Sequence, residues 1–93
     1  MRAVKADLAI VVPDQVTAES VETAIRAAGG RLLESVRLFD VYRGPGLAEG
    51  RKSLAFSLTY RGEDRTLTDE EVTAAHSKLV SKVEEAVGGE LRA

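Results

Sequence analysis

Residues 35–62 read SVRLFDVYRGPGLAEGRKSLAFSLTYRG, and this stretch decides the fold. Two runs rich in apolar, aromatic and β-branched side chains flank the glycine-rich segment 44–50, which is the pattern of a β-hairpin. In the second run, residues 51–60, large apolar and small side chains alternate, so one face of the predicted sheet is buried and the other is not. Asp40 and Tyr42 lie two apart in the first run and should therefore point to the same face.

Symmetric closure of the loop predicts which side chains share each face of the hairpin. Tyr42 then lies opposite about Arg51, and Asp40 lies opposite about Ser53. One face carries a carboxylate, a tyrosine ring and small side chains, namely Asp40, Tyr42, Ser53, Ala55 and Ser57. The other face carries the large apolar side chains, which we expect beneath helices, namely Phe39, Val41, Leu54, Phe56 and Leu58.

The segments before the hairpin predict a strand and a helix. Residues 7–12 are a short β-branched run that is closed by Pro13 and Asp14, which favours a strand followed by a turn. Apolar side chains at helical spacing predict a helix from about Thr17 to a glycine stop at residues 29–30. Residues 31–43 are predicted to be extended as they enter the hairpin.

The segments after the hairpin predict a second helix and a short strand. A polar loop, residues 61–67, precedes Thr68 and Glu71, whose spacing is that of a capping box. The apolar stripe of this helix ends at Gly88, and residues 90–93 suffice for a short strand. The order β-α-β-β-α-β predicts an α+β, ferredoxin-like sandwich, in which a four-stranded antiparallel sheet carries both helices on one face. We expect a single domain over residues 1–93.

Composition excludes several kinds of chemistry. The chain has no cysteine, which rules out a disulfide framework, thiolate metal ligands and a thiol nucleophile. Its one histidine, His76, lies in the apolar stripe of the second helix, where a structural role is expected. We predict no metal and no cofactor. No apolar run approaches the ~20 residues that span a bilayer, so we expect a cytoplasmic protein without a membrane partner.

The charge pattern narrows the possible partners. The net charge of −2 argues against indiscriminate nucleic-acid binding, although residues 31–65 carry seven basic and five acidic side chains. Arg43, Arg51 and Lys52 flank the hairpin loop. They either hold a phosphate backbone or serve only to keep the surface soluble.

The predicted Asp40 and Tyr42 face suits a nucleic-acid base. An exposed aromatic ring stacks on a base, and a carboxylate accepts hydrogen bonds from the N1–H and N2–H₂ groups of guanine. The alternative is an ordinary solvated sheet face on which Tyr42 packs sideways against its neighbours. The residues alone leave both open.

Two further function classes are known for domains of this topology. Acylphosphatases share this topology, but they need an arginine in the loop after the first strand and an asparagine. Residues 13–17 contain no arginine, and the chain contains no asparagine, so we do not expect an enzyme. A free-standing regulatory or assembly domain, which dimerises or binds a small ligand through the open sheet face, is the alternative to an RNA-binding module.

Three motifs carry a resemblance to a known family. LFDVYRG at residues 38–44, KSLAFSL at 52–58 and RTLTDEEV at 65–72 resemble the C-terminal ferredoxin-fold anticodon-binding domain of the bacterial phenylalanyl-tRNA synthetase β subunit. The similarity runs from about Asp7 to Arg92. It implies a non-catalytic module that grips the anticodon stem-loop of phenylalanine tRNA, whose anticodon begins with guanine, while catalysis takes place on the α subunit.

The resemblance also implies site residues and partners. The anticodon-contact positions of the family fall at Asp40 and Tyr42, with Ser53 across the hairpin. The implied partners are the tRNA, the rest of the β subunit and the α subunit. Because the family domain ends a much longer chain, an excised domain and a free-standing relative both remain open.

Overall fold

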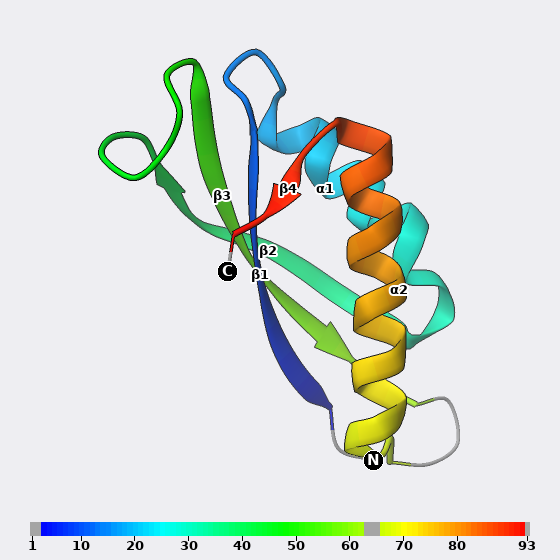
Figure 1. The fold of residues 1–93 in the computed structure, drawn as a ribbon. Helices are drawn as coiled ribbons and strands as arrows, with labels where there is room; N and C mark the ends of the chain where they lie inside the picture. Colours follow the sequence, from blue (N-terminus) through cyan, green and yellow to red (C-terminus); the bar gives the residue numbers. More distant parts are fainter. Residues whose placement is uncertain (1–2, 63–65, 93) are drawn as a thin grey trace.

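The chain folds into one antiparallel sheet with two helices packed on a single face (Figure 1). The computed structural model describes residues 3–62 and 66–92. Its elements, in chain order, are β1 (Val4–Pro13), α1 (Ala18–Gly29), the 3₁₀ turn η1 (Gly30–Leu32), β2 (Leu33–Tyr42), β3 (Arg51–Tyr60), α2 (Asp69–Val87) and β4 (Glu90–Leu91). Within these described residues the sheet has the strand order β2-β3-β1-β4. The predicted ferredoxin-like α+β fold is confirmed.

Both helices begin at the threonines that the sequence indicated. The Thr17 hydroxyl accepts from the backbone N–H of Ser20 at 3.1 Å. At the start of α2, the Thr68 hydroxyl accepts from the N–H of Glu71 at 3.1 Å, and the Glu71 carboxylate accepts from the N–H of Thr68 at 3.0 Å. This reciprocal pair satisfies two backbone donors that no helical carbonyl reaches, which confirms the predicted capping box.

Some element bounds differ from the expectation. β1 begins at Val4 rather than at residue 7, because its first residues pair with the end of β3, from Leu58 to Tyr60. Residues 30–32 form a 3₁₀ turn before the chain becomes extended. Residues 63–65, part of the predicted loop 61–67 and the first residue of the third motif, lie outside the described residues.

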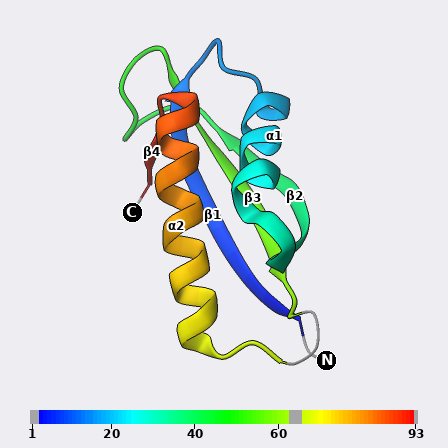
Figure 2. The ribbon, with the colours of Figure 1, turned by 90° about the vertical axis from the view of Figure 1, so that its right-hand side faces the viewer.

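The core lies between the sheet and the two helices (Figure 2). Alternate residues of β1 and β3 meet the apolar stripes of α1 and α2. The fully enclosed side chains include Leu8, Ile10, Val21, Ile25, Phe56, Leu58 and Leu79. Burial of one such side chain is worth about 1.5–3 kcal/mol, so this layer fixes which face of the sheet stays open.

The hairpin register is shifted by two residues from symmetric closure. Tyr42 pairs with Ser53, and Asp40 pairs with Ala55. The predicted partners, Arg51 for Tyr42 and Ser53 for Asp40, were therefore wrong. The predicted common face survives because a two-residue shift returns each side chain to the same side of the sheet.

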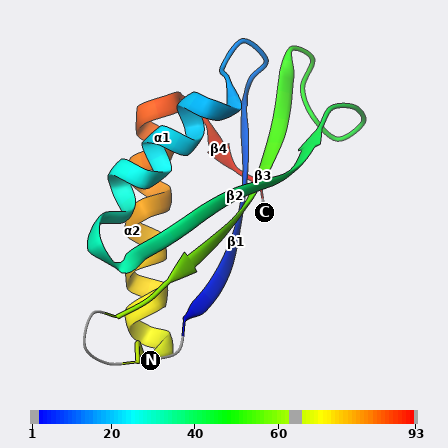
Figure 3. The ribbon, with the colours of Figure 1, turned by 180° about the vertical axis from the view of Figure 1, so that it is seen from behind.

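A β-bulge at Phe39 overturns part of the predicted inner face. Leu38 pairs with Phe56 and Asp40 with Ala55, which leaves Phe39 without a register partner. The side chain of Phe39 is 52% exposed and that of Val41 is 43% exposed. Neither is covered as expected, because the bulge interrupts the alternation and the hairpin extends beyond α1 (Figure 3).

Candidate nucleic-acid interface

Neither helix covers one face of the sheet, which is called the open face below (Figures 1 and 3). The strand register places its side chains in rows. Each row crosses β2, β3 and β1 at one register position. The row nearest the hairpin loop is Tyr42, Ser53 and Val11. The next is Asp40, Ala55 and Ala9, followed by Arg37, Ser57 and Asp7. Tyr42, Asp40 and Arg37 thus lie along the β2 edge, and small side chains form the floor along β3.

The hairpin loop holds the ring of Tyr42 in place. The Tyr42 hydroxyl donates a hydrogen bond to the carbonyl oxygen of Pro45 at 2.7 Å. Gly44 lies between them at φ 140°, and a Cβ at this position would lie 3.4 Å from the Tyr42 hydroxyl oxygen. The positive φ, rather than the space beside the phenol, is what favours glycine here.

Arg92 covers one side of the same ring. Its Cζ lies 4.8 Å from the ring centroid of Tyr42, which is the geometry of a cation–π contact. Its backbone N–H donates to the carbonyl oxygen of Ala9 at 2.8 Å, just beyond the two-residue strand β4. Sequence reasoning did not select Arg92 as a site residue, because a two-residue strand carries no register signal.

The structure brings Asp40 and Ser53 to the open face beside Tyr42, as the sequence predicted. Asp40 is exposed, and among residues 3–62 and 66–92 it has no hydrogen-bond or ion-pair partner. Ser53 is 3% exposed, so its hydroxyl lies in the floor between Tyr42 and Val11 rather than on a free surface.

The three basic residues at the hairpin are less available than the sequence suggested. The Nε of Arg43 lies 2.7 Å from Oδ1 of Asp14, and this hydrogen bond holds the pKa of Asp14 below its usual range. Lys52 is 8% exposed, and its backbone pairs with that of Val12. Arg51 is half-buried, with one buried guanidinium nitrogen that has no hydrogen-bond partner. They therefore do not form an open cationic patch.

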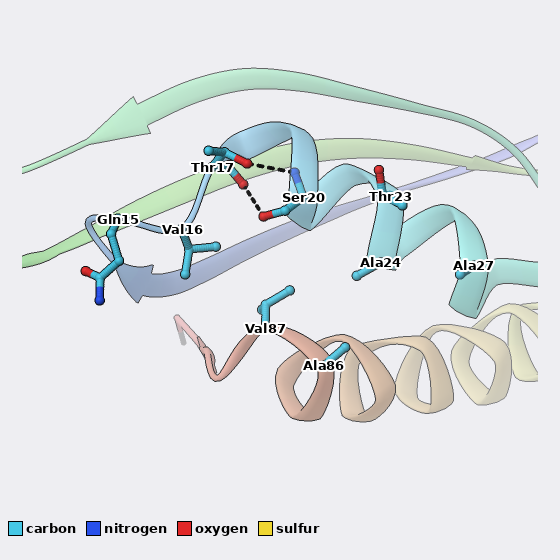
Figure 4. Close-up of a pocket in the computed structure, with 9 residues that line it drawn as sticks. All are labelled: Gln15, Val16, Thr17, Ser20, Thr23, Ala24, Ala27, Ala86 and Val87. Atoms are coloured by element: carbon cyan, nitrogen blue, oxygen red, sulfur yellow. Dashed lines mark hydrogen bonds between the residues drawn. The ribbon is translucent and has the colours of Figure 1, made fainter.

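A shallow cavity on the helix side has fewer free polar groups for a ligand than the open face. It measures about 490 Å³ and lies between the start of α1 and the end of α2 (Figure 4). The Thr17 and Ser20 groups on its wall hydrogen-bond to one another, and Ala24, Ala27 and Ala86 supply much of the remaining lining. In the described part of the chain, no group of His, Cys, Asp and Glu is arranged to hold a metal, and no helix is long and apolar enough to cross a membrane.

Comparison with known families decides the class of this domain. The model of the ferredoxin-fold anticodon-binding domain matches residues 1–92. The chain belongs to this family. The family is defined by binding of an anticodon rather than by a reaction, which confirms the prediction of a binding module that is not an enzyme.

Relatives at high identity sharpen the assignment within the anticodon-binding family. The chain is 58% identical over 90 residues to the phenylalanine–tRNA ligase beta subunit of Symbiobacterium thermophilum, covering 97% of this chain and 10% of the relative. The identity is 53% over 90 residues to that of Anaeromyxobacter dehalogenans and 49% over 90 residues to that of Clostridium tetani. Each of these two matches covers 97% of this chain and 11% of the relative. The chain therefore spans about a tenth of the length of these curated relatives.

Proposed function

We propose that this domain, residues 1–93, binds the anticodon stem-loop of phenylalanine tRNA through its open face. The observation that carries the proposal is the fixed ring of Tyr42 beside the unpaired carboxylate of Asp40, in adjacent rows at one edge of the sheet. The relatives, all phenylalanine–tRNA ligase beta subunits, supply the identity of the RNA. In a longer protein the rest of the beta subunit and an alpha subunit would be its partners, in the cytoplasm.

Each site residue has a distinct task in this mechanism. The first anticodon base, guanine, stacks on Tyr42 and donates hydrogen bonds from N1–H and N2–H₂ to the Asp40 carboxylate. Arg92 caps the ring in the free protein and moves aside when the base arrives, because guanidinium and base compete for the same aromatic surface. The Ser53 hydroxyl then supports the base from the floor.

Basic residues at the hairpin complete the proposed contact. Of Arg43, Arg51 and Lys52, Arg43 is the one placed to meet a phosphate on the loop side of the stacked base, because Lys52 is 8% exposed and Arg51 is half-buried. Arg43 is the most accessible of the three, and its ion pair with Asp14 is exposed and easily exchanged for a phosphate.

Titration of a labelled anticodon stem-loop tests the proposal. Base–aromatic stacking is worth about 1–3 kcal/mol, so Tyr42→Ala should weaken binding about tenfold or more, whereas Tyr42→Phe keeps the ring and should cost much less. Asp40→Ala should weaken binding of the guanine stem-loop and abolish its preference over an otherwise identical adenine stem-loop.

The control for Asp40 uses a carboxylate on the helix layer. Glu85 is exposed on α2, so Glu85→Ala removes the same charge far from the open face. General electrostatics predicts that both changes strengthen RNA binding slightly, whereas base recognition predicts that only Asp40→Ala weakens it. Unchanged affinity for both Tyr42→Ala and Asp40→Ala, or a stable dimer that buries Tyr42 and excludes RNA, would refute the proposal.

A further inference from the structure

The exposed arginines of this chain differ in whether a carboxylate neutralises them. Arg26 pairs with Glu22 at 3.2 Å, Arg61 with Glu34 at 2.7 Å, and Arg43 with Asp14. By contrast, Arg37 and Arg92 are exposed, and neither has an ion-pair partner among residues 3–62 and 66–92. Both of these arginines meet the open face: Arg92 lies over Tyr42, and Arg37 shares a register row with Ser57.

Arg37 lies at a definite place relative to the proposed base site. Its row is adjacent to that of Asp40, on the side away from Tyr42. On β3 these two rows are two residues, about 7 Å, apart, and on β2 the bulged Phe39 lies between Arg37 and Asp40. The long guanidinium side chain can therefore reach a group that adjoins a base held at Asp40. The floor beside it consists of Ala55 and Ser57, so no bulky side chain of β3 lies in the way.

Carboxylates limit where an RNA backbone can run across this face. Asp7 ends the row of Arg37 on β1, two strands away, and the structure gives no ion pair between them. A phosphate is repelled by Asp7 and attracted by Arg37, which keeps the backbone at the β2 edge. Along that edge, the ring of Tyr42, the carboxylate of Asp40, the bulged Phe39 and the guanidinium of Arg37 follow one another from the hairpin loop toward η1.

Resting on the proposed function, we propose that Arg37 binds the phosphate of the nucleotide next to the base that stacks on Tyr42. The RNA strand then runs along β2, away from the hairpin loop. A planar guanidinium suits this task because its N–H groups match two phosphate oxygens at once. The contact positions the strand without reading its sequence.

The experiment measures binding of the labelled anticodon stem-loop at about 50 to 200 mM salt. Arg37→Ala should weaken binding about threefold to tenfold at the lowest salt and make the slope of log K against log salt shallower by about 0.7. The preference for the guanine over the adenine stem-loop should not change. Arg37→Lys should recover part of the loss, since it restores the charge without the fork.

Lys82→Ala is the matched control, because Lys82 is an exposed cation on α2 in the helix layer. It changes the net charge equally and should change affinity less than about twofold. If Arg37→Ala behaves like Lys82→Ala while Tyr42→Ala still impairs binding, the phosphate contact is refuted and the proposed function stands. If Arg37→Ala abolishes the guanine preference, Arg37 reads a base and the inference is wrong. If Tyr42→Ala and Asp40→Ala are also without effect, both proposals fail.

Discussion

At the scale of single residues, the buried phenol of Tyr60 and the ring of His76 form one polar contact in the core layer. The Tyr60 oxygen lies 2.9 Å from Nδ1 of His76, and the two rings meet edge to face at 5.9 Å between centroids. Burial raises the pKa of Tyr60 to about 12, so the phenol keeps its proton. The contact gives a buried hydroxyl the partner that it needs.

This contact predicts a loss of stability in mild acid. Burial lowers the pKa of His76 below 6.5, and a hydrogen bond to the backbone of Asp7 offsets this only in part. The unfolded chain therefore binds more protons than the folded chain below about pH 6.5, and stability falls as the pH falls toward the folded-state value. Urea unfolding at about pH 8 and about pH 5.5 measures the difference.

His76→Gln serves as the control, since glutamine can partner Tyr60 but does not titrate. Its free energy of unfolding should change less over this range than that of the unaltered chain. The pKa values of Asp14 and Glu34 are held below 3.8 and 4.5 by their arginine partners, so their effects fall at lower pH. Equal pH dependence in the two proteins would contradict the assignment to His76.

The proposed site residues differ in how far the sequence alone could place them. Asp40 and Tyr42 could be placed on one face because strand periodicity survives an error of two residues in register. The burial of Lys52 and the cover of Tyr42 by Arg92 depend on β1 and β4, which lie far from the hairpin in sequence. Local patterns carry no information about such long-range neighbours.

At the scale of elements, the capping box of α2 is the strongest local start signal in the chain. Thr68→Ala removes the hydroxyl that accepts from the N–H of Glu71, and such changes cost about 0.5–2 kcal/mol. Thr73→Ala, at an exposed position inside the same helix, should be neutral or slightly stabilising, because alanine is the better helix former. Denaturant midpoints at constant m-value measure both; equal midpoints would show that the cap contributes nothing.

The strands show which features a sequence pattern can predict and which it cannot. The bounds of β3 follow from strict alternation between two turn signals, and they were predicted to the residue. The bulge at Phe39 has no such signal, since neither glycine nor proline marks it and the preceding residue, Leu38, is also apolar. Pairing across the sheet decides that position, so a one-strand pattern could not show it.

At the scale of the whole molecule, the charge balance limits how firmly the domain alone can hold RNA. The net charge is −2, and the proposed phosphate contacts of this domain are those of Arg43 and Arg37. Two phosphate contacts with single-stranded RNA predict a slope of about −1.4 in log K against log salt. Titration at several salt concentrations checks this value, and a slope steeper than about −3 would require contacts that this face does not provide.

A small number of phosphate contacts agrees with the short length of this chain relative to its relatives. It spans about a tenth of the length of the phenylalanine–tRNA ligase beta subunits that it matches. A module that contributes base recognition and few phosphate contacts is suited to act together with other RNA-binding surfaces, because linked sites raise overall affinity without new contacts in either one.

The brevity of β4 has a consequence for self-association. It pairs with β1 only at Ile10 and Val11, so the outer edge of β1 from Val4 to Leu8 has no strand partner among the described residues. An unpaired edge is a template for another chain to extend the sheet. Lys5 and Asp7 are exposed along it, and charges on an edge strand discourage such pairing. These two side chains thus guard against aggregation, and an apolar replacement of either would remove that protection while leaving every element of the fold in place.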